Sequence, residues 1–478
     1  MAWDTVIGLE VHAQLKTKSK LFSATATTFG AKPNTQTSFI DAGLPGVLPV
    51  LNQAAVRMAI QFGLAINAKI NNNSYFERKN YFYPDLPKGY QISQYQAPIV
   101  SHGYLMIELD EGIEKKIPIV RAHLEEDAGK SLHEAHHIYS GIDLNRAGTP
   151  LLEIVTAPCL FSAEEAVTYL KKLHQLVRFL GICDGNMQEG SFRCDVNISL
   201  KPKGVEQLGV RTELKNLNSF RFIEKAIAYE QARHQDLLES GEIIQQETRL
   251  YNPDTNTTHA LRSKENENDY RYFPDPDLLP IQIEASYLED IRETMPILPE
   301  QIMQECQKNS SLNREDINFI LASPASYYFF MAVKGSSIAD EKTIINWLKG
   351  VYAAALNEAN LSFDKPPVSA SSLAMLLDHL AKQTISNKIA KEIFNKLWAG
   401  ETDVDAIIKK QGYTQLTDAN LLEELIQTII QQYPEQVADY RAGKEKLFAF
   451  FVGQIMKQTK GQASPEQITN LLKKYLNP

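Results

Sequence analysis

The sequence predicts an α+β protein in which an antiparallel β-sheet cradle domain is followed by an all-α helical domain and a small α-helical tail domain. Up to about residue 293, short alternating apolar and polar runs are separated by Gly, Pro, Asn and Asp, which is typical of an antiparallel sheet with long loops. Beyond that point, most segments place apolar residues at helical spacing. The 478 residues also exceed what one hydrophobic core usually spans, so several domains are expected.

The domain boundaries follow the change in pattern. We expect the β-rich cradle at residues 1–293, the helical domain at 294–400 and the helical tail at 401–478. Helices inside the cradle are expected at 52–65, 162–180 and 219–240. Later helices are expected at 299–308, 341–359, 369–398, 419–432 and 444–458, with a linker candidate at 364–367. The last helix has a start signal, since Ser464 can cap it, Pro465 can occupy its first position and Gln467 completes the capping box.

Composition and charge exclude several classes of protein. The net charge of −9 argues against a generally basic protein that coats nucleic acid, although it allows a local basic patch. No apolar run approaches the roughly 18 residues of a membrane span, and the amino terminus lacks the basic start and apolar stretch of a signal peptide. The four cysteines form no C-x-x-C pair, which argues against a zinc ribbon and a disulfide framework. We therefore expect a cytoplasmic protein with no membrane partner.

The carboxy-terminal stretch departs from this acidic average. Residues 441–478 contain seven Lys or Arg residues and two Glu residues, a local net charge of +5. A basic helical module in an acidic chain can bind nucleic acid, whereas the plainer interpretation is a solvated helix face.

The first predicted strand, residues 5–12, carries polar groups on one face. Thr5, Ile7, Leu9 and Val11 point to one side of this strand, and Val6, Gly8, Glu10 and His12 point to the other. Glu10 and His12 are thus about 7 Å apart along the strand and could reach a single cation, while Gly8 leaves room for a ligand.

The same arrangement recurs in four later strands. The polar-face residues are Arg121, His123, Glu125 and Asp127; Glu153 in an otherwise apolar run; Arg193, Asp195 and Asn197; and Arg211, Glu213 and Lys215. An ionised Glu in an apolar run is costly unless it is paired or bound to a metal. Acids interleaved with Arg and Lys indicate a floor for a polyanion and its divalent cation, although a solvated sheet face would carry similar charges.

Common nucleotide and zinc motifs give little support to other sites. The sequence has neither G-x-x-x-x-G-K-[ST] nor G-x-G-x-x-G, so any ATP would bind on a sheet face. Residues 133–137 match H-E-x-x-H, which in zinc proteases requires a full helix with both His on one face. This match lies between Gly129 and Gly141, which leaves room for few helical turns, so a chance His-rich loop is favoured over a metallohydrolase that uses His133 and His137.

Two further segments mix basic and aromatic residues. Residues 78–83 read Arg-Lys-Asn-Tyr-Phe-Tyr, and residues 269–273 read Asp-Tyr-Arg-Tyr-Phe. Such mixtures can bind nucleotides by stacking and charge, and they also occur as hydrogen-bonded Tyr residues at the edge of a core.

Long motifs resemble one enzyme family. Residues 6–15 (VIGLEVHAQL) resemble the opening of the second, non-amidase chain of aspartyl/glutamyl-tRNA amidotransferase, the GatB family. Further matching runs follow in that family's order at 77–95, 123–130, 143–155, 187–198, 213–220 and 269–278, and the stretch around Phe451–Lys457 resembles its tail module. The resemblance covers essentially the whole chain.

The resemblance implies a ligase reaction. Glutamate mischarged on glutamine tRNA, or aspartate on asparagine tRNA, would be activated by ATP at its side-chain carboxylate as an acyl phosphate. Ammonia released from glutamine by a partner amidase (the A component) would then displace phosphate, and a small third component, C, would complete a heterotrimer. Activation is needed because a carboxylate has no good leaving group.

The resemblance also implies roles for particular residues. The metal ligands would be Glu10, His12, Glu125, Glu153 and Asp195, and these acids would be catalytic together with Lys79 and Lys88. The metal would be Mg²⁺, or Mn²⁺ because His12 is an unusual ligand for Mg²⁺. Arg193, Arg211 and Lys215 are candidate phosphate contacts, and Lys79 and Lys88 would line the ammonia route or meet the anionic intermediate.

This chain departs from the family pattern at one place. Many relatives carry C-x-x-C just before the L-P-G turn, where this chain has Ser38-Phe39-Ile40-Asp41, so no structural zinc is expected. A different class of function also stays open: a tRNA-binding scaffold without catalysis, which would tolerate the loss of Glu125 and Asp195.

Overall fold

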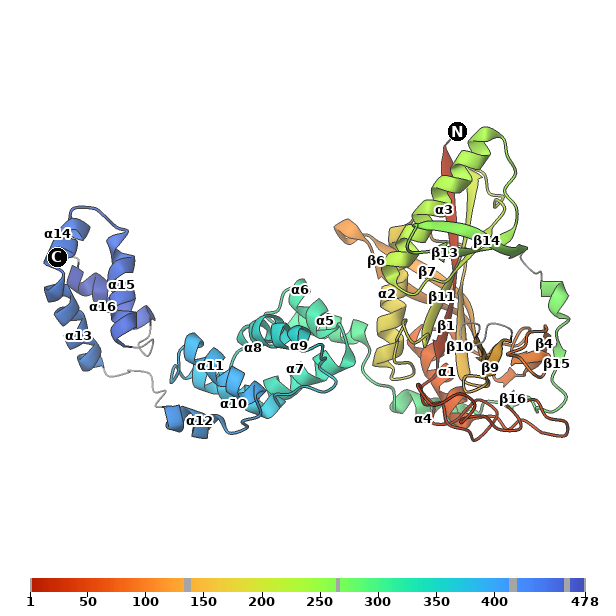
Figure 1. Ribbon diagram of the computed structural model, residues 1–478, viewed down its shortest axis with the longest axis horizontal. Coiled ribbons are helices and arrows are strands. Elements are labelled where there is room, and N and C mark those ends of the chain that lie inside the picture. The colour runs from red at the N-terminus through yellow and green to blue at the C-terminus, as the bar shows by residue number, and fades with distance from the viewer. Residues whose placement is uncertain (1, 133–138, 264–266, 412–418, 460–464, 477–478) are drawn as a thin grey trace. The chain divides into compact units, whose positions relative to one another are not determined.

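The chain forms two compact units in the computed structural model, Met1–Pro299 and Glu300–Pro478, and each is described by itself (Figure 1). The structure describes residues 2–132, 139–263, 267–411, 419–459 and 465–476. The predicted order of a β-rich region followed by a helical region is confirmed, because every strand lies in the first unit and the second unit is helical throughout its described part.

A nine-stranded sheet organises the first unit. Its strand order is β14-β13-β12-β11-β1-β10-β7-β6-β2. The strands are β1 (Trp3–Gln14), β2 (Lys69–Ile70), β6 (Val100–Glu108), β7 (Glu114–Glu126), β10 (Pro150–Thr156), β11 (Phe192–Pro202), β12 (Thr212–Lys215), β13 (Glu247–Asn252) and β14 (Thr257–Ser263). Neighbours pair antiparallel, as predicted, except that β12 and β13 pair parallel. The expected strand at 210–215 begins two residues later, at Thr212.

Smaller β-structures accompany this sheet. A three-stranded sheet has the order β15-β4-β5, and two strand pairs are β16-β3 and β8-β9. Their bounds are β3 (Asn73–Ser74), β4 (Glu77–Asn80), β5 (Tyr90–Ser93), β8 (Lys130–Leu132), β9 (Gly141–Asp143), β15 (Phe273–Pro274) and β16 (Ile281–Gln282). Short 3₁₀ turns lie at Asp110–Gly112 and Glu267–Tyr270.

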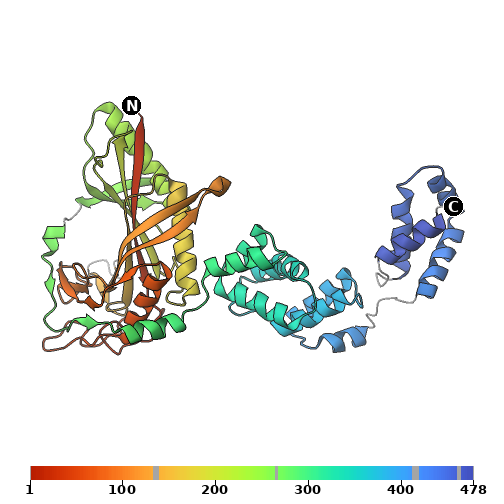
Figure 2. The same cartoon turned by 180° about the vertical axis from the view of Figure 1, so that it is seen from behind.

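Helices cover one face of the large sheet. The three predicted cradle helices are confirmed as α1 (Gln53–Ala65), α2 (Ala163–Phe179) and α3 (Phe220–Ser240), and each begins after a residue whose side chain accepts a backbone hydrogen bond: Asn52, Ser162 and Ser219. Figure 2 shows α2 and α3 along one side of the strands. Their apolar residues share one core with Ile7, Leu9 and Val11 of β1. The opposite face of β1, with Glu10 and His12, is therefore left for polar chemistry. A fourth helix, α4 (Ala285–Glu293), follows β16.

The second unit consists of helices. They are α5 (Pro299–Asn309), α6 (Arg314–Ile320), α7 (Pro324–Ser336), α8 (Glu341–Trp347), α9 (Ala353–Glu358), α10 (Ala370–Ala381), α11 (Asn387–Trp398), α12 (Val404–Gln411), α13 (Ala419–Gln432), α14 (Pro434–Arg441), α15 (Leu447–Gln458) and α16 (Pro465–Leu476). The expected helix at 341–359 contains a π-helical turn at Leu348–Tyr352 between α8 and α9. The capping prediction at Ser464 lies outside the described residues.

One helix prediction in this unit was wrong. The segment 369–398 forms two helices, α10 and α11, rather than one. Gln383 adopts a left-handed φ of 56°, which ends the first helix, and the Ser386 side chain accepts the Ile389 N–H, which begins the second. Apolar spacing continues across the break, so periodicity alone does not reveal it.

The last four helices have a core of their own. Buried residues of this core include Leu422, Ile426, Phe451 and Leu472. Helix α12 packs instead against α10 and α11, although the predicted boundary at residue 401 assigns it to the tail. The three-domain division stays a prediction. No helix among the described residues is both long and apolar enough to cross a membrane.

Candidate active site

Strand register aligns the polar side chains in rows across the sheet. One row, read across β7, β10, β1 and β11, is His123, Glu153, His12 and Arg193. The adjacent row on the same face is Arg121, Val155, Glu10 and Asp195. Residues two apart on a strand share a face, and directly opposite residues stand about 5 Å apart. The polar faces predicted strand by strand therefore belong to one continuous surface.

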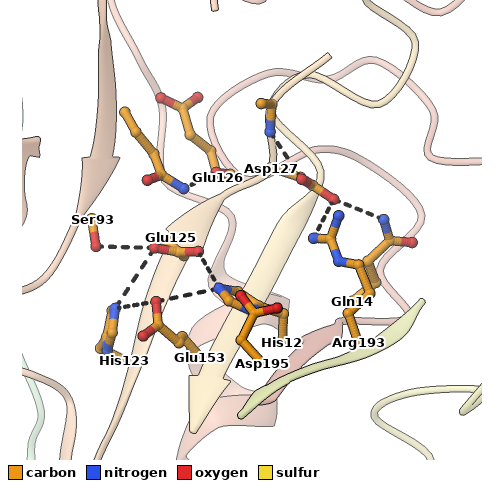
Figure 3. Close-up of polar contacts among 12 residues, drawn as sticks. His12, Gln14, Ser93, His123, Glu125, Glu126, Asp127, Glu153, Arg193 and Asp195 are labelled. Carbon is orange, nitrogen blue, oxygen red and sulfur yellow. Dashed lines mark hydrogen bonds and ion pairs between the residues drawn. The ribbon is translucent and has the colours of Figure 1, made fainter. Parts of the chain in front are cut away.

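Three of the predicted metal ligands meet on this surface (Figure 3). His12 Nε2 lies 3.4 Å from Glu125 Oε1 and 3.4 Å from Glu153 Oε2. One donor atom from each of these three residues lies within 4.8 Å of the other two. The carboxylates are buried, with Glu125 2% and Glu153 8% exposed. His123 approaches both from the neighbouring strand, at 3.7 and 3.3 Å.

Electrostatics in this cluster favour charged side chains. Burial opposes the charge on His12, but hydrogen bonds to Glu125 and Glu153 outweigh burial and raise its pKa to about 10. Burial likewise opposes the charge on both glutamates, and the two histidines hold their pKa values well below the usual range. Two ionised carboxylates and one imidazole form a donor set that fits a divalent cation, with oxygen ligands for Mg²⁺ and a nitrogen ligand better suited to Mn²⁺.

Glu10 and Asp195, the other two predicted ligands, lie directly opposite each other one row away. Asn197 Nδ2 donates to Glu10 Oε1 at 2.9 Å, and Lys215 Nζ donates to Asp195 Oδ2 at 2.6 Å. Both acids line a cavity of about 380 Å³ together with His12 and Glu153. The structure thus gathers four of the five predicted ligands in one cavity but places only three, with Glu125, in the tight cluster.

The predicted phosphate contacts differ in how they are paired. Arg193 donates to Asp127 at 3.0 Å, and Lys215 pairs with Asp195, so both cations already have carboxylate partners. Arg211 lines the cavity and, among the described residues, forms no ion pair. Arg121 lines the same cavity, and its Nε is buried without a hydrogen-bond partner in the described part of the chain. The sequence placed Arg121 on the polar face but assigned it no role.

Lys79 and Lys88 lie in different surroundings. Lys79 lines the cavity, with Nζ 4.7 Å from the Tyr270 ring centroid. Burial opposes its charge, but the carboxylates of Glu125 and Glu153 outweigh burial and raise its pKa. Lys88 instead pairs with Glu126, whose Oε1 also accepts the Ile92 N–H at 2.9 Å. The shared role in ammonia passage stays a prediction.

Aromatic side chains form the wall that faces the sheet. Tyr81 and Tyr83 from the first mixed segment, and Tyr270 and Tyr272 from the second, line the cavity. Tyr272 stacks on Tyr95 with ring centroids 4.5 Å apart. The two segments come together because β15 pairs with β4. Arg78 serves the fold instead, since it pairs with Asp275 at 2.8 Å.

A second cavity, also of about 380 Å³, adjoins the first. The two share His12, Lys79, Tyr81, Asp195 and Lys215. Glu125, Asp127 and Arg193 line only the second. The cation cluster therefore has its residues distributed over two cavities, which is suitable for bringing two reactants to one centre.

Two other sequence features complete the comparison. His133 and His137 of the H-E-x-x-H match lie outside the described residues. At the position of the missing C-x-x-C, Asp41 pairs with the buried Lys20 at 3.1 Å and accepts a hydrogen bond from Ser23 at 3.0 Å. These contacts join the loop to the segment that follows β1.

Comparison with known families agrees with this architecture. Residues 5–289 match the family described as the GatB/GatE catalytic domain, and residues 328–476 match the family described as the GatB domain. The chain belongs to the GatB family. The predicted family is confirmed, and the chain is accordingly a component of an amidotransferase, an enzyme class that forms carbon–nitrogen bonds.

Curated relatives are similar over the full length. The chain is 70% identical over 476 residues to a protein of Legionella pneumophila (strain Lens) that is named as the GatB-type component of aspartyl/glutamyl-tRNA(Asn/Gln) amidotransferase, with 100% of both chains covered. Proteins of the same name from Nitrosococcus oceani and Coxiella burnetii are 56% and 54% identical over 477 residues, again with 100% coverage of both chains. The whole GatB architecture is therefore shared.

Proposed function

We propose that this GatB chain carries out ATP-dependent transamidation of Glu-tRNA(Gln), Asp-tRNA(Asn) or both through an acyl-phosphate intermediate. The observation that carries this proposal is the cluster of His12, Glu125 and Glu153 beside a cavity with cationic side chains. Carboxylates that hold a cation, next to cations that have no carboxylate partner, suit a phosphorylated substrate and its metal. The names of the full-length relatives supply the substrate class.

His12, Glu125 and Glu153 would hold a divalent cation, with Glu10 and Asp195 supporting its outer side. When bound there, Mg²⁺ or Mn²⁺ would neutralise charge on the phosphate oxygens. The guanidinium groups of Arg121 and Arg211 have no carboxylate partner among the described residues, so they are available to phosphate oxygens. Arg193 and Lys215 would act mainly by fixing Asp127 and Asp195.

The reaction then needs two displacements. The side-chain carboxylate of the aminoacyl group attacks the γ-phosphorus of ATP, and ADP leaves. Ammonia attacks the resulting acyl carbon, phosphate leaves as the C–N bond forms, and the nitrogen loses a proton. Charged Lys79 lies beside the cluster and would attract the anionic intermediate, while the Tyr81, Tyr270 and Tyr272 rings limit the access of water.

The partners follow from the chemistry. Among the described residues no cysteine lines the main cavity, and burial raises the pKa of the Cys194 thiol beside the second cavity, which makes it a poor nucleophile. Ammonia would therefore come from glutamine hydrolysis in a partner amidase, with a small third protein completing the assembly. Lys79 and Lys88 remain our candidates for the end of the ammonia route. The basic last helices would bind the tRNA, and the reaction belongs in the cytoplasm, where mischarged tRNA is made.

The test is ATP hydrolysis that depends on Glu-tRNA(Gln) in the assembled complex. Glu125→Gln and Asp195→Asn keep the side-chain shape but remove the charge, and each should lower the rate at least about 100-fold. Glu114→Gln is a matched control, because Glu114 is an exposed residue at the other end of the same strand, β7. Full activity in both site variants would refute the assignment and favour the scaffold function.

A further inference from the structure

A third cavity, of about 180 Å³, continues the polar face of the sheet away from the cation cluster. It shares Glu10, Val155 and Arg211 with the main cavity. Its own lining comprises Val6, Gly8, Leu9, Thr156, Pro158, Asn197, Ser199, Leu208 and Gly209. The two cavities are therefore neighbouring compartments on one surface.

Polarity changes along β1 between these compartments. His12 and Glu10 lie at the charged end, whereas Gly8 and Val6 continue the same face into the third cavity. Asn197 and Ser199 stand directly opposite Gly8 and Val6 on β11. The surface thus changes from ionised groups to an apolar floor edged by an amide and a hydroxyl.

The walls leave room for a flat group. Gly8 has no side chain, and the nearest atoms to a β-carbon placed there are those of Pro158, at 3.7 Å or more. The outer wall is the segment between β11 and β12, which contributes the half-exposed Leu208. This segment can lie close to β11 because Gly209 has no β-carbon, which would otherwise stand 2.0 Å from the Leu200 carbonyl oxygen.

We propose that this third cavity holds the adenine ring of ATP, an inference that rests on the proposed function. A nucleoside triphosphate has the same polarity profile as the surface, with charged phosphates at one end and a flat base with apolar faces and a polar edge at the other. Placing the phosphates beside Arg211 and the cation cluster directs the base over Gly8. Asn197 and Ser199 then lie within the compartment that meets its polar edge, and Pro158 and Leu208 contact its faces.

Gly8→Val in the full-length protein tests this inference. The added side chain enters the cavity, while the surrounding protein leaves space for at least its first carbon. We expect the Kd of Mg·ATP to rise at least about tenfold, corresponding to about 1.4 kcal/mol. The Kd of Mg·tripolyphosphate, which has phosphates but no base, should stay within about twofold of wild type. Gly8→Ala should show a smaller effect in the same direction, and Gly335→Ala, in an open position on α7, serves as the control.

The outcomes separate this inference from the proposed function. If wild type binds no Mg·ATP, the proposed function itself fails. If wild type binds Mg·ATP and Gly8→Val binds it equally well, or if Gly8→Val loses both ligands equally, the adenine assignment is wrong while the proposed function stands.

A second arm distinguishes ATP from the other adenosine in the reaction, the 3′-terminal nucleotide of tRNA. In the assembled complex, Gly8→Ala should raise KM for ATP and leave KM for Glu-tRNA(Gln) unchanged. The reverse pattern would show that the cavity takes the tRNA terminus and would overturn the assignment to ATP.

Discussion

His12 and Glu153 stand directly opposite each other on β1 and β10, with His12 Nε2 3.4 Å from Glu153 Oε2. Strand register alone creates this contact between residues far apart in the sequence. Glu125 joins the pair from β7, because it lies one position beyond the row on the same sheet face. The predicted ligand cluster is thus built into the sheet rather than into a loop, which keeps the donor atoms in place before a cation binds.

We expect His12→Ala to weaken binding of a divalent cation. Loss of hydrogen-bonded groups around a bound metal typically lowers affinity about 10- to 100-fold, and loss of a direct donor should cost at least as much. Calorimetric titration of the full chain with Mn²⁺ measures the change. His259→Ala, on the exposed side of β14, should bind as wild type. Equal affinities for wild type and His12→Ala would remove His12 from the ligand set.

Arg121→Gln should raise KM for ATP about tenfold or more, because hydrogen bonds to charged groups contribute about 1.5–3 kcal/mol. Arg121→Lys should recover part of this loss, since it restores the charge without the planar fork. Steady-state kinetics of the assembled complex measures both. Lys116→Gln, on the same strand but stacked on Tyr104, is the control. An unchanged KM in Arg121→Gln would show that another cation binds the phosphates.

Glu230 on α3 should make stability depend on pH. Its buried carboxylate pairs with Arg233 at 2.8 Å and Arg249 at 3.1 Å, and His234 lies 3.4 Å away. Burial opposes the charge, but these partners and Thr258 lower its pKa to about 2. A lowered pKa stabilises the fold fully above the unfolded-state value of about 4.5, and this contribution disappears as pH falls towards 2.

Glu230→Gln should therefore lower the free energy of unfolding by about 3 kcal/mol at pH 7. The difference from wild type should shrink steadily between about pH 4.5 and about pH 2, as urea unfolding followed at several pH values would reveal. Glu224→Gln, on an exposed part of the same helix, should match wild type throughout. A difference that does not change with pH would show that the glutamate contributes by shape rather than charge.

The basic last helices should bind tRNA. Replacing the exposed residues Lys446, Lys457 and Lys473 with Gln should raise the Kd for tRNA and reduce its dependence on salt, because fewer counterions are released. Gel-shift measurements at several salt concentrations test this. The matched control changes the exposed residues Lys382, Lys388 and Lys391.

Deletion provides a second test of the tail. We expect removal of residues 401–478 to weaken tRNA binding while the glutaminase activity of the partner stays intact. Removal of 419–478 alone is the cleaner experiment, because it leaves α12 packed against α10 and α11. Unchanged tRNA affinity after either deletion would refute this role.

Much of the fold was predictable because local signals and tertiary packing agree. Asn52, Ser162 and Ser219 cap helices where apolar spacing begins, and the alternation along β1 matches its buried and exposed sides. The break at Gln383 was missed because the left-handed turn interrupts the backbone without interrupting the apolar pattern. The parallel β12–β13 pair was missed because strand direction depends on the path of α3 between them, not on strand composition.

The sequence by itself determined which side chains face away from the core, since alternation along a strand assigns each residue to a side. It could not determine which of those side chains meet. Glu125 contacts His12 although β10 lies between their strands, whereas Arg193 and Lys215 turn to carboxylate partners of their own. Only the register and order of the strands decide these distances, because hydrogen bonds between strands place residues side by side whatever their separation along the chain.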